Sequence, residues 1–268
     1  MTWIIGAPTM FSYAVALADV QATLIYTNGK RRYIDGVVQK IFPIERFIAA
    51  GYSGSIEIGF FLIEDLKKWA VLTDKKTAWI PDCIVQKWHR RARWLFSKID
   101  KKKQSFTEVI LLGVYPQKSN GIPGESQTYC CSMKSPDFIP SITVPGRICS
   151  IGSGNDIQTY KKIIEDLSAV YNPLMQLEVQ NPGGYGRALS LFISLKVKDD
   201  PQLGISKHFH TCYIKRGEVT ISANNYSITN ADGSIEIVKM PKVATNWQEF
   251  LVLMKKKGIT LARACAVG

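Results

Sequence analysis

Residues 2–7, Thr-Trp-Ile-Ile-Gly-Ala, and residues 13–19, Tyr-Ala-Val-Ala-Leu-Ala-Asp, decide how the chain begins to fold. Both are short, almost uninterrupted apolar runs, and Pro8 to Ser12 separate them. Apolar runs of this length, bounded by turn residues, are typical of strands that are buried on both faces. The sequence therefore predicts a buried hairpin that ends at Asp19, the first charged residue of the chain.

The next segment predicts a second pair of strands and then a helix. Residues 21–26 and 36–44 are strand-like, and Asn28-Gly29 between them is a strong signal for a hairpin turn. We therefore expect these two runs to pair. From Ser55 onward, apolar residues recur every three or four positions, which predicts an amphipathic helix. The recurring residues are Ile56, Phe60, Ile63, Leu66 and Trp69.

The rest of the chain alternates between blocks of helices and blocks of strands. Asp82 is expected to cap the N-terminus of a second helix. Further strands are expected at 107–115, 128–133, 138–144, 147–151, 209–214 and 218–222, and further helices at 156–171, 185–197 and 246–257. The helix over 185–197 is nearly apolar, which predicts that it is buried. Separate blocks favour an α+β fold with a sheet-on-sheet centre and helices outside.

The composition is that of an ordinary globular protein, with 46% hydrophobic and 21% charged residues among 268. It excludes a disordered tail, a collagen and a disulfide-stapled miniprotein. No Pro-, Gly- or Ser-rich linker divides the chain, so we expect a single domain over residues 1–268. Within it, residues 223–268 form a C-terminal extension with a closing helix, and the sequence predicts little else about that extension.

Cysteine usage and hydropathy bear on the compartment. The six cysteines form no C-x-x-C pair and no dense framework, which favours a reducing compartment, so we expect a cytoplasmic protein. Ala16-Leu17-Ala18 would suit a signal-peptide cleavage site, but no basic segment precedes it, and Pro8, Thr9 and Ser12 interrupt the apolar core. No segment reaches the ~18 consecutive apolar residues of a membrane span, so we expect no membrane partner.

The charge is strongly positive and unevenly spread. Thirty-four Lys and Arg against 22 Asp and Glu give a net charge of +12, which attracts anionic partners. Eight basic residues lie in the basic cluster, residues 87–103, against the single acid Asp100. This cluster leaves open a role in binding nucleic acid or an acidic protein, but basic helices on globular proteins are mostly solvated faces, so nucleic acid is a disfavoured partner.

Metal chemistry finds little support in the sequence. His89 lies in the basic cluster, and His208 and His210 flank Phe209 on one face of a predicted strand. That pair lacks, at any readable spacing, the third and fourth ligands that a zinc site needs. We therefore favour a structural or surface role for the histidines and expect no metal and no cofactor.

Thr2 offers a different kind of chemistry. The initiator methionine is normally removed when the next residue is as small as threonine, so the mature chain is expected to begin with a hydroxyl and a free α-amino group on one residue. An α-amine has a pKa of about 7.7–8.0 and is partly unprotonated at neutral pH. It can accept the hydroxyl proton and so make Thr2 a self-contained nucleophile and base.

Thr2 belongs to the first of five short motifs, which occur in a fixed order along the chain. They are Thr2-Trp3-Ile4-Ile5-Gly6, Asp19-Val20-Gln21-Ala22-Thr23, Lys40-Ile41, Ser53-Gly54 and Gly152-Ser153-Gly154. Together they resemble the proteasome β-subunit family and its simpler bacterial relatives, within the N-terminal nucleophile (Ntn) hydrolases. The 14-residue spacing between Lys40 and Gly54 matches that family. The resemblance implies a four-layer αββα sandwich of two antiparallel sheets flanked by helices, and assembly into a homo-oligomer.

The resemblance also implies catalytic roles. Thr2 would be the nucleophile and its amine the base. Lys40 would sit near the hydroxyl as an ammonium that lowers the pKa of nearby groups, and Asp19 would hold Lys40 in place. The backbone N–H of Gly54 would donate to the oxyanion of the tetrahedral intermediate.

Other residues would bind the substrate or support the amine. The resemblance implies that Thr23 and Ser53 line a cleft in which an extended peptide pairs as an added strand. Ser153 and Asp200 match polar groups around the terminal amine. The serine that the family places three residues after that aspartate is Leu203 here, which weakens the role of the amine as base.

The sequence thus predicts a threonine-type Ntn hydrolase that cleaves amide bonds in peptides or unfolded proteins after removal of Met1. One alternative is a catalytically inactive structural subunit of the same fold, which Leu203 favours and the set of Thr2, Asp19 and Lys40 opposes. Another is a binder of nucleic acid or acidic partners through the basic cluster. Cleavage preference, oligomer size and any need for an ATPase partner stay open.

Overall fold

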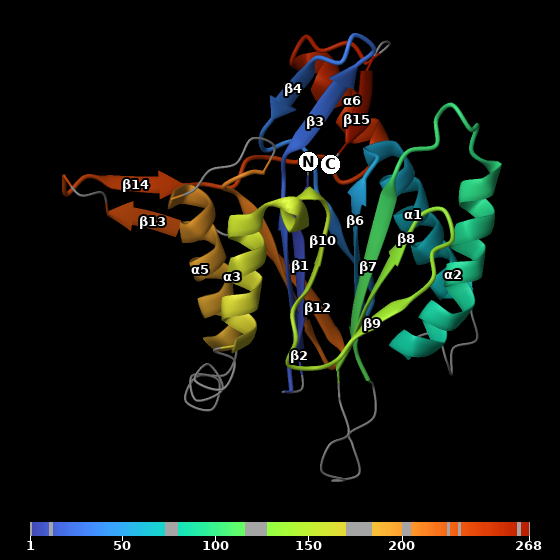
Figure 1. The fold of residues 1–268 in the computed structure, drawn as a ribbon, viewed down its shortest axis with the longest axis horizontal. Coiled ribbons are helices and arrows are strands. Elements are labelled where there is room, and N and C mark those ends of the chain that lie inside the picture. Colours follow the sequence, from blue (N-terminus) through green and yellow to red (C-terminus); the bar gives the residue numbers. More distant parts are fainter. Residues whose placement is uncertain are drawn as a thin grey trace.

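The computed structural model describes residues 2–10, 13–72, 80–115, 128–169, 184–199, 205–223, 226–229, 232–261 and 264–267. These residues form a mixed α+β structure whose sheets are antiparallel (Figure 1). The α+β class expected from the sequence is therefore confirmed.

Two five-stranded sheets form the centre of the molecule. The first has the order β10-β1-β2-β11-β12, with bounds β10 (Cys149–Ile151), β1 (Ile4–Pro8), β2 (Tyr13–Asp19), β11 (Phe209–Lys215) and β12 (Glu218–Ala223). The second has the order β5-β6-β7-β8-β9, with bounds β5 (Ile41–Glu45), β6 (Ile48–Gly54), β7 (Thr107–Val114), β8 (Thr128–Lys134) and β9 (Ser141–Thr143). Every residue of β1, β2 and β7 is buried, which explains their continuous apolar runs.

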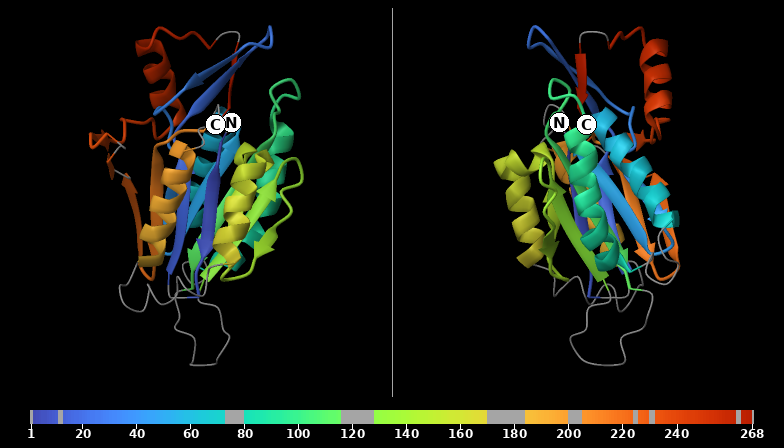
Figure 2. Two further views of the ribbon diagram at one scale, coloured as in Figure 1. Left: turned by 60° about the vertical axis from the view of Figure 1, so that its left-hand side comes forward. Right: turned by 90° about the vertical axis from the view of Figure 1, so that its right-hand side faces the viewer.

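The two sheets pack against each other, and helices cover their outer faces (Figures 1 and 2). Ile4 and Ala16 of the first sheet share one buried cluster with Ile110 and Leu112 of the second. The helices α1 (Ile56–Leu72) and α2 (Pro81–Lys98) cover the second sheet, and α3 (Gln158–Ala169) and α5 (Gly184–Asp199) cover the first. The short 3-10 helix η1 (Ser153–Asp156) follows β10.

A smaller group of elements lies at the end of the molecule where β1 begins (Figure 1). A three-stranded sheet has the order β15-β3-β4, with bounds β15 (Ala264–Val267), β3 (Ala22–Tyr26) and β4 (Arg31–Ile34). Helix α6 (Trp247–Lys256) begins after Asn246, whose side chain accepts a hydrogen bond of 2.9 Å from the N–H of Glu249. The hairpin of β13 (Tyr226–Thr229) and β14 (Ile235–Val238) projects to one side.

The expected strand pairing after the first hairpin is wrong. The hairpin of residues 2–7 and 13–19 is confirmed as β1 and β2, and Gly29 takes the positive φ (+77°) that the predicted turn needs. However, β3 pairs with β4, not with 36–44, and β5 pairs instead with β6. Two adjacent charged residues such as Arg31 and Arg32 are more typical of a loop than of a strand. Both side chains are exposed on the edge strand β4, where charge is tolerated.

Two predictions about helices are also wrong. Helix α2 begins at Pro81 with Ile80 as its N-cap, so Asp82 lies inside the first turn. Proline suits this first position because its missing N–H would have no partner there. Helix α5 is not fully buried, because only the stripe that faces the sheet is covered. Leu191, Phe192 and Leu195 on its other side are 52%, 38% and 37% exposed.

The other predicted helices and strands differ from the observed ones mainly in length. Helices α3 and α6, strands β7 and β8, and the hairpin of β11 and β12 are confirmed. Of the strand expected at 138–144, only Ser141–Thr143 is observed as β9, since Phe138, with a positive φ of 51°, still belongs to the turn over 135–138. No helix among the described parts of the chain has both the length and the apolar character needed to cross a membrane.

Candidate active site

The first hairpin places Thr2 and Asp19 at the same end of the first sheet. Ile4 of β1 lies opposite Ala18 of β2, so the next residue, Asp19, lies beside Trp3 at the start of β1. The N–H of Asp19 donates to the Trp3 carbonyl (3.1 Å), and the N–H of Trp3 donates to Asp19 Oδ1 (2.9 Å). These two bonds fix the Asp19 side chain against the backbone next to Thr2.

Asp19 forms a fully buried ion pair with Lys40. The distance from Lys40 Nζ to Asp19 Oδ1 is 2.8 Å, and both side chains are completely inaccessible to solvent. The other carboxylate oxygen, Oδ2, accepts from the N–H of Gln21 (3.2 Å) and of Ser206 (3.4 Å). Burial lowers the pKa of Lys40, and the charge of Asp19 opposes that shift. A buried pair of this kind is seldom kept for stability, since desolvation offsets much of its attraction.

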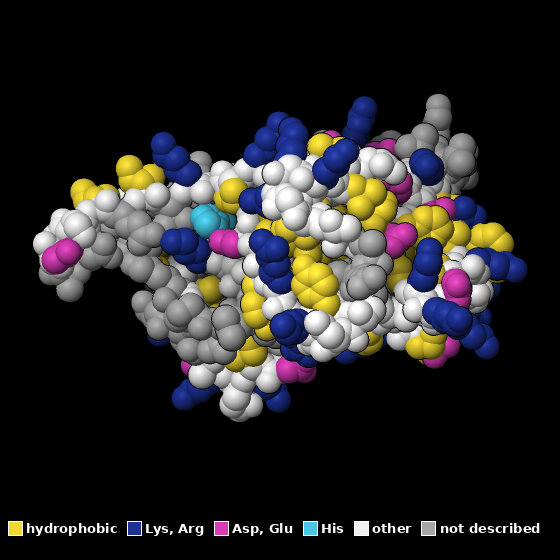
Figure 3. Space-filling view, turned by 90° about the horizontal axis from the view of Figure 1, so that it is seen from above, with side chains coloured by type: hydrophobic (Ala, Val, Ile, Leu, Met, Phe, Trp, Pro, Cys, Tyr) yellow, Lys and Arg dark blue, Asp and Glu magenta, His cyan; other side chains and the backbone are white. Residues whose placement is uncertain are grey.

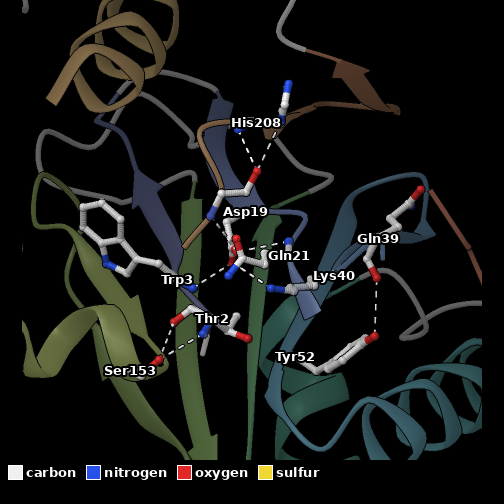
Figure 4. A network of polar contacts seen from close by, with 10 residues as sticks. Thr2, Trp3, Asp19, Gln21, Gln39, Lys40, Tyr52, Ser153 and His208 are labelled. Atoms are coloured by element: carbon white, nitrogen blue, oxygen red, sulfur yellow. Dashed lines mark hydrogen bonds and ion pairs between the residues drawn. The ribbon is translucent and has the colours of Figure 1, made fainter. Parts of the chain in front are cut away.

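Thr2 lies beside this pair, with its hydroxyl unsatisfied (Figure 4). Its side chain is 1% exposed, and among the described residues Oγ1 has no hydrogen-bond partner. Its N–H donates to Ser153 Oγ (3.0 Å), and its carbonyl accepts from the N–H of Gly154 (3.1 Å). A buried hydroxyl without a partner typically costs about 1–3 kcal/mol, so its retention points to a functional role.

Thr2 borders a cavity of about 450 Å³. The wall of this cavity combines residues that are far apart in the chain: Thr2, Thr23, Ile25, Arg31, Ser53, Gly54, Ser105, Phe106, Glu108, Lys134, Gly152, Ser153, Asn155, Asp156 and Val267. Gly54 has a φ of +92°, and a Cβ there would lie 2.0 Å from the Phe106 carbonyl oxygen. Gly152 has a φ of +88°, and its Cβ would lie 2.4 Å from the Thr2 carbonyl oxygen. Both positions therefore require glycine.

Glu108 ties together several residues that line the cavity. Its Oε2 accepts from the N–H of Gly152 (2.7 Å) and from Ser53 Oγ (3.1 Å), and its Oε1 pairs with Lys134 Nζ (3.0 Å). Sequence reasoning missed this residue. It is the one charged side chain in the apolar run of β7, and a charge in such a run is a signal that a buried polar contact exists.

The structure brings together most of the residues expected at the site. Thr23, Ser53, Gly54 and Ser153 line the cavity with Thr2, and Asp19 and Lys40 lie buried next to Thr2. Asp200 and Leu203 lie outside the described residues. Ser206 was missed as a donor to Asp19, since only the fold brings its backbone to β2.

The histidines take structural positions. His208 precedes β11 instead of lying on it, and its Nδ1 lies 3.1 Å from Asp35 Oδ2 and 3.4 Å from Ser206 Oγ. His210 is buried, which lowers its pKa to about 4. Within the described ranges, no three His, Cys, Asp or Glu side chains gather as metal ligands.

The basic cluster is partly engaged within the molecule. Arg91 forms a bidentate pair with Asp65, with nitrogen–oxygen distances of 2.6–3.1 Å, and Trp88 Nε1 donates to the same carboxylate (3.2 Å). This pair ties α2 to α1. On another face, which includes β3, β4 and α6, Figure 3 shows Lys and Arg spread between uncharged side chains and not gathered into one patch.

Neither family models nor curated protein sequences match this chain. A scan against models of protein families finds no match to the chain. A search of curated protein sequences likewise finds no relative with significant similarity.

Proposed function

We propose that the chain is a threonine-type Ntn hydrolase, similar to proteasome β subunits and their simpler bacterial relatives, that cleaves amide bonds in peptides or unfolded proteins. The observation that carries this proposal is that Thr2, whose hydroxyl has no partner among the described residues, lies beside the buried ion pair of Lys40 and Asp19 at the edge of a cavity. Two facing sheets with helices outside also suit the four-layer αββα sandwich of that family.

The proposed reaction starts with removal of Met1, which turns the Thr2 nitrogen into a primary amine. This amine takes the proton from Oγ1 while the oxygen attacks the carbonyl carbon of the substrate. The amide C–N bond then breaks, the leaving nitrogen receives that proton, and the acyl group stays on Thr2 as an ester. Water, deprotonated by the same amine, hydrolyses the ester and regenerates the hydroxyl.

The surrounding residues have distinct roles in this proposal. Lys40, as an ammonium, favours negative charge on the Thr2 oxygen, and Asp19 keeps the ammonium in place. Ser153 Oγ, which already lies 3.0 Å from the Thr2 nitrogen, orients the amine. The resemblance assigns a second supporting role to Asp200, which lies outside the described residues. The N–H of Gly54 stabilises the oxyanion, a contribution typically worth about 10²–10³ in rate.

Two further features belong to the same proposal. Thr23 and Ser53 both line the cavity and suit a peptide that adds as a strand. The exposed apolar side chains Leu191, Phe192 and Leu195 on α5 support assembly into a homo-oligomer, since such surface is usually covered. Sedimentation analysis of the purified protein tests that assembly.

A covalent probe tests the hydrolase directly. Wild type, Thr2→Ala and Thr2→Ser are each incubated with a peptide epoxyketone, and intact masses are measured. All three chains have a small second residue, so Met1 removal is matched. We expect labelling of wild type and of Thr2→Ser, which retains a hydroxyl, and none of Thr2→Ala.

The same experiment separates the hydrolase from an inactive structural subunit, the alternative that Leu203 favours. An inactive subunit leaves all three proteins unlabelled although they are folded. Equal labelling of Thr2→Ala and wild type would place the nucleophile elsewhere.

A further inference from the structure

A strand near the far end of the described chain, β15, borders the cavity that the proposed function assigns to substrate. β15 pairs antiparallel with β3, with Ala264 opposite Tyr26, Ala266 opposite Leu24 and Val267 opposite Thr23. On its other side, Val267 forms a bridge with Ser55, the residue after Gly54. β15 therefore reaches across the gap between β3 and the end of β6.

The end of β15 also reaches the nucleophile. Val267 lines the same cavity as Thr2, Thr23 and Gly54. The ends marked N and C lie next to each other in Figure 1 and in both views of Figure 2. As β15 runs from Ala264 to Val267, its register on β3 moves from Tyr26 toward Thr23, and so toward Thr2.

One edge of a strand accepts only one neighbour, because each N–H and C=O on that edge is used once. The edge of β3 that β15 occupies cannot pair with a second peptide at the same time. We propose that β15 is a built-in occupant of a peptide-binding groove between β3 and Ser55, and that an extended peptide binds by displacing it. The effect on hydrolysis rests on the proposed function, but the groove and its occupant do not.

β15 also indicates which peptides the groove accepts. Its sequence is Ala-Cys-Ala-Val, and the Ala266 side chain is 8% exposed, so that position accepts a small apolar side chain. A four-residue strand paired with one neighbour and joined by one bridge is a small structural unit, which opens more easily than the core sheets. The ligand class is thus an extended peptide with small apolar side chains.

Binding of a fluorescent Ala-Cys-Ala-Val peptide in reducing buffer tests the groove. Ala266→Asp places a charge at a buried position and should release β15, whereas Thr260→Asp places the same charge at an exposed position outside the strand. All proteins carry Thr2→Ala, so no chemistry intervenes. We expect fluorescence polarisation to show at least about tenfold tighter binding to the Ala266→Asp protein than to the other two, because the groove is no longer occupied. Equal affinities, or no binding to the Ala266→Asp protein, would overturn the proposal.

Hydrogen exchange of the unsubstituted chain covers the case in which Ala266→Asp fails to fold. Excess peptide should speed exchange of the β15 amides at least about tenfold while β1 and β2 keep their protection. Unchanged exchange in β15 at saturating peptide would contradict displacement. Epoxyketone labelling of Ala266→Asp with Thr2 intact then separates the two proposals. Peptide binding without labelling would support the peptide-binding groove and contradict the proposed hydrolase activity.

Discussion

Two buried carboxylates, Asp19 beside Thr2 and Glu108 in the lining of the cavity, each pair with a lysine, and their lysine partners differ. Lys40 is fully buried with Asp19, whereas the side chain of Lys134 is 63% exposed beside Glu108. Both carboxylates also accept backbone N–H groups, from Trp3 and from Gly152 respectively. The difference shows that one pair places a desolvated charge next to Thr2, while the other mainly fixes the wall of the cavity.

The largest expected effect comes from removing the buried lysine. Lys40→Met leaves Asp19 buried without its counter-charge, so we expect the free energy of unfolding to fall by about 3–5 kcal/mol and Thr2 labelling to be lost. Lys134→Met is the matched control, because it removes an exposed lysine from the other carboxylate. It should cost below about 1 kcal/mol in urea unfolding. Equal losses would remove the distinction between the two pairs.

The buried imidazole of His210, whose Nδ1 has no hydrogen-bond partner among the described residues, gives the next largest effect. His210 lies opposite Ala18 on β2, next to Asp19, and its pKa is lowered from 6.5 to about 4. Between pH 6.5 and 4 the unfolded chain binds a proton that the folded chain does not, so stability falls as the pH falls, by about 3 kcal/mol in total.

The pH dependence of urea unfolding checks this value. His210→Gln should flatten the acid side of the stability curve, whereas His208→Gln should leave it in place because His210 is retained. A curve of the same shape for His210→Gln would show that another group titrates.

Replacing the second carboxylate should have a smaller effect than breaking the first pair. Glu108→Gln keeps the shape but weakens the acceptors for Ser53 and Gly152, so we expect a loss of about 1–3 kcal/mol and slower labelling of Thr2. Glu64→Gln on the exposed face of α1 is the control and should change stability by less than about 0.5 kcal/mol. A Glu108→Gln protein with wild-type stability and labelling would argue against a wall held by this carboxylate.

The surface pair Arg91–Asp65 should stabilise the fold least among the ion pairs compared. Its side chains are 41% and 13% exposed, so solvent screens much of the attraction. A double-mutant cycle with Arg91→Ala and Asp65→Ala should give a coupling energy of about 0.5–1 kcal/mol. A coupling energy as large as that of Lys40 and Asp19 would show that burial does not determine how strongly these ion pairs stabilise the fold.

The sequence predicted those parts of the fold in which local pattern and tertiary environment agree. β1 and β2 are buried on both faces, so their apolar runs indicate strands without further information. β4 begins with the exposed Arg31 and Arg32, and only its pairing with β3 makes it a strand. β15 was missed because four residues define a strand only once the distant edge of β3 is placed beside them.

Parts of the candidate site could likewise be predicted from the sequence, and other parts depend on the fold. The motifs around Thr2, Asp19 and Lys40 could be recognised from the sequence, but their meeting depends on how β2 and the segment before β5 pack. The sequence gives no sign that Lys40 is buried, because burial is a property of the two stacked sheets. Glu108 could have been noticed as a charge within an apolar strand, although not its bond to Gly152.

The most direct test of the central claim is to map the epoxyketone adduct on the wild-type protein by tandem mass spectrometry. The reagent has two electrophilic centres, so it reports on the hydroxyl and the amine of a terminal threonine together. We predict a chain that begins at Thr2 and carries the adduct on that residue. A chain that retains Met1, or an adduct on any other residue, would contradict the account.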